Sequence, residues 1–146
     1  MRCILIILFT LIVSSCKVNY RQKIDLTGTV WECEITDGCI NTYKFTSNST
    51  FLFLSCEMED EYFGYYYFKN GYLMIDQIGS INEQELFNSS EEATERKLYK
   101  VKITETKLKH LSMSYLINEK WILSDFKFDA KYIYKKIDSI PPFNSF

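Results

Sequence analysis

The chain has 146 residues, with 17 basic and 19 acidic side chains and a formal net charge of −2 at pH 7. This length favours a single domain. A slightly acidic chain with scattered lysines lacks the clustered cations that nucleic-acid backbones require. Eleven Phe, eleven Tyr and two Trp stand against only two Ala, and this composition favours strands over helices.

The first sixteen residues, MRCILIILFTLIVSSC, have the layout of a secretion signal. Arg2 supplies a positive charge, an apolar run covers 4–13, and two small residues precede Cys16. The run is too short to span a bilayer stably. The sequence VSSC at 13–16 resembles the lipobox of bacterial lipoproteins. The resemblance implies cleavage before Cys16, acylation of Cys16 with palmitate among the acyl groups, and a membrane-tethered chain. An uncleaved helix and a signal without lipid are the alternatives.

The leader also predicts where the chain resides. The residues KVNY at 17–20 lack the acidic cluster that sends some lipoproteins to the outer surface. We therefore expect a lipid anchor in the bacterial cell envelope, in the outer membrane and facing the periplasm. The expected organisation is a signal peptide at 1–15, a tether at 16–25, one β-barrel domain at 26–140 and a tail at 141–146.

Short strands separated by turn residues fill most of the remaining chain. We expect strands at 27–35, 40–45, 50–56, 62–68, 72–78, 98–104, 107–116, 121–128 and 131–137. Asn70-Gly71 is the clearest hairpin signal, because Asn and Gly tolerate the positive φ of a tight turn. The stretch 79–96 breaks the pattern, and Ser89 followed by Glu92 predicts a short surface helix there, with a loop excursion as the alternative.

Eight or nine strands with local connections favour an up-and-down barrel over a Greek-key sandwich. We predict an all-β fold, an antiparallel meander closed into an approximately eight-stranded barrel. Gly28 and Trp31 in the stretch LTGTVW resemble the opening strand of lipocalin-like barrels. The resemblance implies that Trp31 closes the barrel floor beneath a late-strand cation, here Lys131 or Lys135. The family spacing is Gly-x-Trp, whereas two residues separate the pair here. An ordinary core Trp is the alternative.

An eight-stranded barrel either fills itself with side chains or holds one small ligand. The candidate ligand-binding rings are Trp31, Tyr43, Phe53, Tyr65, Tyr67 and Tyr72. They predict a non-enzymatic protein that binds a small apolar or amphipathic ligand, or a peptide. The alternative is a protein-binding module such as an inhibitor of an envelope enzyme, because the stretch WECE at 31–34 resembles the first strand of small lipoproteins that inhibit lysozyme.

The five cysteines separate into groups by position. Cys3 lies in the leader and Cys16 is the lipid acceptor, which leaves Cys33, Cys39 and Cys56 in an oxidising compartment. Three is an odd number, so one internal disulfide is the maximum. A zinc site is disfavoured, because these spacings do not match a metal-ligand pattern.

Strand register predicts the pairing. If Trp31, Phe45 and Phe51 lie side by side on adjacent strands, Cys56 falls opposite the residue that follows Cys39. We therefore predict a disulfide between Cys39 and Cys56, with the third cysteine as a buried thiol. A slip of one residue would favour other pairs.

The sequence lacks a recognisable set of catalytic residues. His110 is the only histidine, and a nucleophile elbow of the Gly-x-Ser-x-Gly type is missing. A surface or hydrogen-bonded strand residue is the simpler interpretation of His110. Acidic residues around Asp60 lie in a turn without the pattern of a calcium loop. We expect no catalytic residue, no cofactor and no metal, and a membrane partner through the lipid on Cys16.

Overall fold

The computed structural model describes residues 24–81, 96–130 and 132–137. Several expectations lie outside this range. They concern the signal peptide, the lipid on Cys16, the tether up to residue 23, the helix signal at Ser89 and Glu92, Lys131 and the tail.

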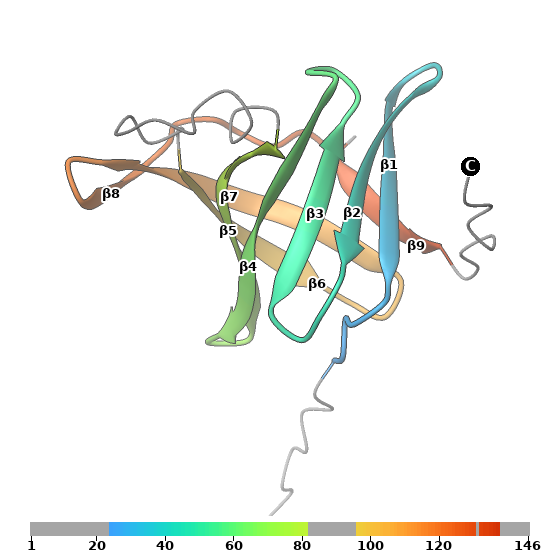
Figure 1. The fold of residues 1–146 in the computed structure, drawn as a ribbon, viewed down its shortest axis with the longest axis horizontal. Helices are drawn as coiled ribbons and strands as arrows, with labels where there is room; N and C mark the ends of the chain where they lie inside the picture. Colours follow the sequence, from blue (N-terminus) through green and yellow to red (C-terminus); the bar gives the residue numbers. More distant parts are fainter. Residues whose placement is uncertain (1–23, 82–95, 131, 138–146) are drawn as a thin grey trace, which may run out of the picture.

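Nine strands form one antiparallel sheet. They are β1 (Val30–Thr36), β2 (Cys39–Phe45), β3 (Thr50–Ser55), β4 (Asp60–Lys69), β5 (Tyr72–Ser80), β6 (Lys97–Ile103), β7 (Lys107–Ile117), β8 (Lys120–Leu123) and β9 (Ile133–Ile137). The strands β1 to β7 pair in sequence order, and β9 then pairs with both β7 and β1. This closes eight strands into a barrel, while β8 pairs with β7 alone among the described residues (Figure 1). The all-β eight-stranded antiparallel barrel predicted from the sequence is confirmed.

The predicted strands match the observed ones to within three residues at each end, with one exception. The strand expected over 121–128 ends at Leu123, and 124–130 runs irregularly towards β9. The reason is that Phe128 leaves the hairpin and packs against the His110 ring, with ring centroids 4.9 Å apart. An apolar stretch can therefore be buried without forming a strand.

Two of the turns have a pair of consecutive residues with the positive φ that tight hairpins require. Asn70 and Gly71 connect β4 to β5 with φ of 52° and 80°, as their sequence predicts. Asn118 and Glu119 connect β7 to β8 with φ of 48° and 62°. Glutamate rarely adopts this conformation, because its Cβ crowds the backbone. The β7–β8 turn therefore carries local strain.

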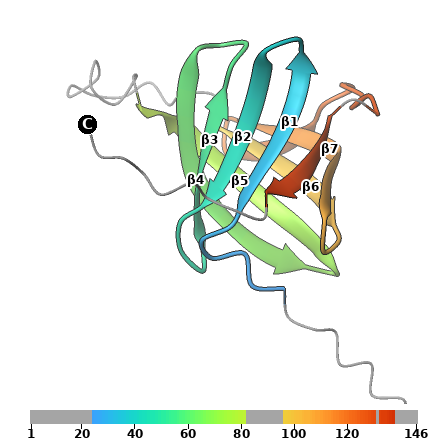
Figure 2. The same ribbon diagram turned by 90° about the vertical axis from the view of Figure 1, so that its right-hand side faces the viewer.

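The barrel has two distinct ends. At the lower end lie 24–29, the β2–β3, β4–β5 and β6–β7 turns, and the end of β9 (Figures 1 and 2). The Lys136 amide donates to the Thr106 carbonyl at 3.2 Å, which ties β9 to the β6–β7 turn. At the upper end lie the β1–β2 and β3–β4 turns, and the β7–β8 hairpin projects sideways from the barrel (Figure 1).

Side chains of alternate residues fill the interior, as strand geometry requires. The largest fully buried side chains are Trp31, Tyr43, Tyr134, Phe45 and Phe51. Gly64 leaves space among them: a Cβ at this position would lie 2.0 Å from the Asp76 carbonyl oxygen and 3.0 Å from the Phe51 ring. The backbones of β4 and β5 approach closely here, next to the bulge between Phe63 and Gly64.

The predicted register was right for one strand pair and shifted for another. Phe45 lies opposite Phe51, as expected, whereas Trp31 lies opposite Tyr43 instead of Phe45. Because the shift is two residues, the side chains of β1, β2 and β3 keep their predicted faces.

Candidate functional site

A cluster of rings occupies the middle of the barrel around Tyr43. Its ring centroid lies 4.5 Å from that of Phe53, 4.9 Å from Tyr134 and 5.7 Å from Phe51. Such separations are those of packed aromatic pairs. The rings therefore fill the space that a ligand at this level would need.

His110 belongs to the same cluster. Its Nε2 and the Tyr43 hydroxyl share a hydrogen bond of 3.2 Å, and its ring stacks on Tyr99 with centroids 5.0 Å apart. Burial lowers the pKa of His110 to about 3, and burial raises the pKa of the Tyr43 hydroxyl. At neutral pH both side chains are uncharged hydrogen-bonding members of the core. His110 is thus the hydrogen-bonded strand residue that the sequence suggests, in a buried position.

The six predicted ligand-binding rings occupy three places. Trp31, Tyr43 and Phe53 point into the barrel, where the first two are fully buried and the third is partly buried. Tyr72 lies near the lower end, with the Lys100 Nζ 4.0 Å from its ring centroid. That distance is typical of a cation–π contact.

Tyr65 and Tyr67 are on the outside of the barrel, where they are 54% and 43% exposed, so an interior position for them is wrong. Tyr66 takes the inward place instead, and its hydroxyl donates to the Ser47 carbonyl at 2.7 Å. Because three tyrosines follow one another, the sequence does not show which of them face the barrel interior. The bulge at Gly64 sets which of them face the core.

A hollow of about 560 Å³ opens at the lower rim of the barrel beside Trp31. The Trp31 indole nitrogen donates to the Thr29 hydroxyl at 2.9 Å, which fixes the ring. The cross-strand partner of Trp31 is Lys136, which also lines the hollow. Lys135, one of the two cations that the family resemblance implies at this place, pairs with Glu32 on the outer face, and Lys131 lies outside the described residues.

The outer face of β4 to β8 carries a second candidate surface. We define the outer aromatic face as Tyr65, Tyr67, Arg96, Trp121 and Leu123. The cross-strand register connects its members, because Tyr65 pairs with Asp76, Asp76 with Leu98, Leu98 with Ser114, and Ser114 with Leu123. The three rings and Leu123 are each exposed by two fifths or more.

Arg96 is held rigidly in this face. Its Nε and Nη2 donate to the two carboxylate oxygens of Asp76 at 2.8 and 2.6 Å. This bidentate bond raises the pKa of the guanidinium and fixes its plane. The guanidinium carbon lies 5.7 Å from the centroid of the Trp121 ring. The outer aromatic face thus has a charged centre whose geometry is set before any partner arrives.

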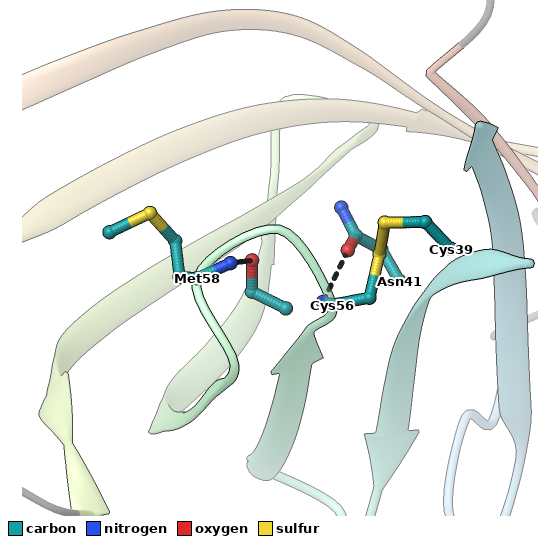
Figure 3. The surroundings of a disulfide bond; sticks show 5 residues. Cys39, Asn41, Cys56 and Met58 are labelled. Carbon is teal, nitrogen blue, oxygen red and sulfur yellow. Dashed lines mark hydrogen bonds between the residues drawn. A yellow bond between two sulfur atoms is a disulfide. The ribbon is translucent and has the colours of Figure 1, made fainter.

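The upper end is held by the disulfide between Cys39 and Cys56, the pair that the register predicts (Figure 3). Their Cα atoms are 5.5 Å apart. The Cys56 amide donates to the Asn41 side-chain oxygen at 2.9 Å, which connects β2 to the β3–β4 turn a second time. Cys33 is a buried thiol outside the bridge.

A further hollow of about 570 Å³ opens where β1 and β9 separate. Pairing between these strands ends at Glu32, and the hollow begins beside it. Glu34, Lys107 and Lys135 are among its lining residues, so its wall is mixed in charge.

Two observations concern metals and membranes. Over the described ranges, His, Cys, Asp and Glu side chains do not gather in threes as metal ligands do. Within the same ranges there is no helix with the length and apolar character needed to cross a bilayer.

Comparison of the chain with protein-family models, with curated proteins and with solved structures finds no match.

Proposed function

We propose that this protein is a lipid-anchored, non-enzymatic binding protein of the bacterial cell envelope, and that it recognises a protein or peptide partner through the outer aromatic face. The lipobox-like leader supports the anchor on Cys16. The packed ring cluster around Tyr43 favours a surface site over one in the middle of the barrel. An inhibitor of an envelope enzyme is one form of such a protein.

The observation that carries this proposal is the arrangement of Arg96 between Asp76 and Trp121. Trp, Tyr and Arg are the residue types that dominate the energetics of protein interfaces. A side chain that is already fixed loses little conformational entropy when a partner binds. The Asp76 carboxylate therefore favours binding by holding Arg96 in place.

The test is affinity capture from a bacterial envelope extract, with the full chain as bait. We expect a stoichiometric partner whose dissociation constant rises at least ~30-fold in Trp121→Ala, as for an interface hot spot. Met58→Ala is the matched control, because Met58 is an exposed apolar side chain in the β3–β4 turn, outside the outer aromatic face. Equal capture by Trp121→Ala and the parent chain would contradict the proposal.

The anchor is tested separately by mass spectrometry of the protein isolated from membranes. We expect a peptide that begins at Cys16 and carries acyl chains. An intact leader with an unmodified Cys16 would refute the anchor and leave the partner site open to its own test.

The lower-rim hollow supports a second candidate function, the binding of a small amphipathic molecule. Its volume of about 560 Å³ lies in the range of small-molecule sites. Ile24 supplies partly exposed apolar surface beside the buried Leu26 and Trp31 side chains, and Lys136 supplies a cation for an acidic head group. A thermal-shift series with fatty acids tests this. We expect a rise in Tm that Lys136→Gln reduces, and unchanged Tm values at millimolar ligand would exclude this candidate.

A further inference from the structure

The lower end of the barrel is rich in lysine. Its cations face outward from β6, β7 and β9 or lie at neighbouring turns and rims, and all of them except the partly buried Lys100 are exposed. They are Lys69, Lys100, Lys102, Lys107, Lys109, Lys135 and Lys136. The carboxylates among them are Asp25, Glu32 and Glu105. Among the residues that the structure describes, cations therefore outnumber anions at this end by more than two to one, although the whole chain is slightly acidic.

Four of these lysines oppose one another directly. We define the lysine face as Lys102, Lys107, Lys109 and Lys135. Lys102 pairs with Lys109 across β6 and β7, and Lys107 pairs with Lys135 across β7 and β9. Like charges directly opposite on a sheet are destabilising. Among the described residues, no ion pair joins any of these four lysines to a carboxylate. The fold thus concentrates positive charge on three adjacent strands, with Glu32 of β1 as a cross-strand neighbour of Lys135.

The disulfide-linked part of the upper end has the opposite charge. Its two disulfide-linked turns and the strand ends beside them carry Glu34, Asp37, Glu57, Glu59, Asp60 and Glu61. The sequence has no lysine or arginine at 34–41 or 55–62. The barrel is therefore polarised along its length. An anionic surface would attract the lower end and repel the upper one.

The chain enters the barrel at the lysine-rich end. Residues 24–29 lie at the lower end, beside the β6–β7 turn and the end of β9, and Ile24, Glu105 and Lys136 line the same hollow (Figure 2). Seven residues separate Ile24 from Cys16, and the eight steps of the chain between them reach at most about 28 Å when extended. A lipid on Cys16 would therefore hold this end near the membrane surface, where headgroup charges act within a Debye length of about 8 Å.

We propose that the lysine face docks on the anionic phospholipid headgroups of the membrane to which the chain is tethered, and so orients the barrel with its acidic end away from the bilayer. The inference rests on the proposed membrane anchor and not on the proposed partner. Each lysine near an anionic bilayer strengthens association by roughly fivefold. Docking would leave Arg96 and Trp121 of the outer aromatic face clear, because they lie nearer the upper part of β6 to β8.

The experiment measures lysine accessibility on vesicles. The full chain is incorporated into vesicles of phosphatidylcholine, with or without phosphatidylglycerol, and acetylated by an amine-reactive reagent before mass spectrometry. We expect the lysine face to react at least ~fivefold more slowly on phosphatidylglycerol vesicles, and high salt to remove this protection. Lys120 and Lys127 are internal controls that should react equally on both. Equal reactivity of the lysine face on both vesicles would overturn the proposal.

Other outcomes separate the possible sources of protection. Protection by inorganic phosphate without vesicles would indicate a free-anion site and overturn the surface docking. Protection on added envelope protein but not on phosphatidylglycerol would indicate a protein partner and overturn it as well. Failure of the anchor alone would have a different signature: the chain would leave phosphatidylcholine vesicles and still bind phosphatidylglycerol vesicles. Failure of docking alone would leave the chain on both vesicles with its lysines unprotected.

A pair of double variants distinguishes docking from a structural role. Lys109→Gln with Lys135→Gln removes one member of each opposed pair, and Lys120→Gln with Lys127→Gln makes the same charge change elsewhere. We expect the first variant to lose most of the phosphatidylglycerol-dependent protection of Lys102 and Lys107 with an unchanged or higher Tm. The second variant should keep the protection. A lower Tm together with full protection in the first variant would show that these lysines serve the fold, and would overturn the proposal.

Discussion

Tyr65, Tyr66 and Tyr67 follow one another on β4, yet they serve two different regions of the molecule. Tyr66 is 5% exposed and packs on Phe45 inside the barrel, with ring centroids 4.9 Å apart. Its neighbours lie on the outer aromatic face. The interior rings stabilise the fold, whereas the outer rings are available for a partner. A single strand therefore separates stability from recognition by alternation alone.

Truncating one ring from each region tests most directly whether the interior rings stabilise the fold and the outer rings do not. We expect Tyr43→Ala to lower the free energy of unfolding by about 4 kcal/mol, because it leaves a cavity at the centre of the ring cluster. Tyr67→Ala should cost no more than about 1 kcal/mol, because its side chain is 43% exposed and lies outside the ring cluster. Urea denaturation followed by tryptophan fluorescence measures both. Similar losses in the two variants would mean that the outer ring also supports the fold.

The cysteines also differ in their roles, because two form the disulfide at the upper end and one is a buried thiol. Cys39 and Cys56 close a loop of sequence separation 17 at the surface, while Cys33 is buried as a thiol. Opening the loop by replacing both bridged cysteines with Ala should lower the unfolding free energy by about 3 kcal/mol on chain-entropy grounds. Calorimetry of the double variant measures this. Cys33→Ala is the control that leaves the bridge intact, and an equal loss in the control would assign the effect to packing instead.

The sequence predicts the strands and the disulfide because both depend on local signals. Turn residues such as Asn70 and Gly71 delimit the strands, and period-two register carries Cys39 and Cys56 to neighbouring positions. The faces of Tyr65 and Tyr67 could not be predicted, because a bulge at Gly64 and the approach of the β5 backbone determine them. Both are tertiary features without a local pattern.

The outer aromatic face was missed for a related reason. Arg96 and Asp76 are 20 positions apart in the sequence, and β4 to β8 must pair before Arg96 comes to lie near Trp121. In the sequence Arg96 is only a charged residue that follows a polar stretch, and its contact with Trp121 has no local signal. The opposed lysines, by contrast, could have been found from the register of the last strands, since Lys102 lies between two apolar residues, Lys107 and Lys109 flank Leu108, and Lys135 follows Tyr134.

Acid should lower the free energy of unfolding through the buried His110. The pKa of His110 is about 3 in the folded protein and about 6.5 in the unfolded chain, so between these values the unfolded state binds more protons. The stabilisation is complete above pH 6.5 and is lost as the pH falls towards 3. Between pH 7 and pH 4.5 this linkage removes about 2.5 kcal/mol. Thermal unfolding across this range measures it. In His110→Gln, which does not titrate, we expect a lower but flatter profile, and an equally steep one would assign the pH dependence to other groups.

The smallest expected effect on the free energy of unfolding comes from the β7–β8 turn, next to the outer aromatic face. Glu119 holds a φ of 62° in the turn before β8, the strand that carries Trp121. Glycine adopts this conformation without steric cost, so Glu119→Gly should raise the unfolding free energy by about 0.5 to 1 kcal/mol. Asn118→Gly is the matched control and should gain less, because asparagine tolerates positive φ better than glutamate does. Differential scanning calorimetry measures both variants. A gain confined to Glu119→Gly, with partner capture retained, would show that the hairpin presenting the outer aromatic face can be stiffened without any change in the ring cluster. A loss of stability in Glu119→Gly would mean instead that the glutamate side chain itself contributes to the hairpin more than its backbone strain costs.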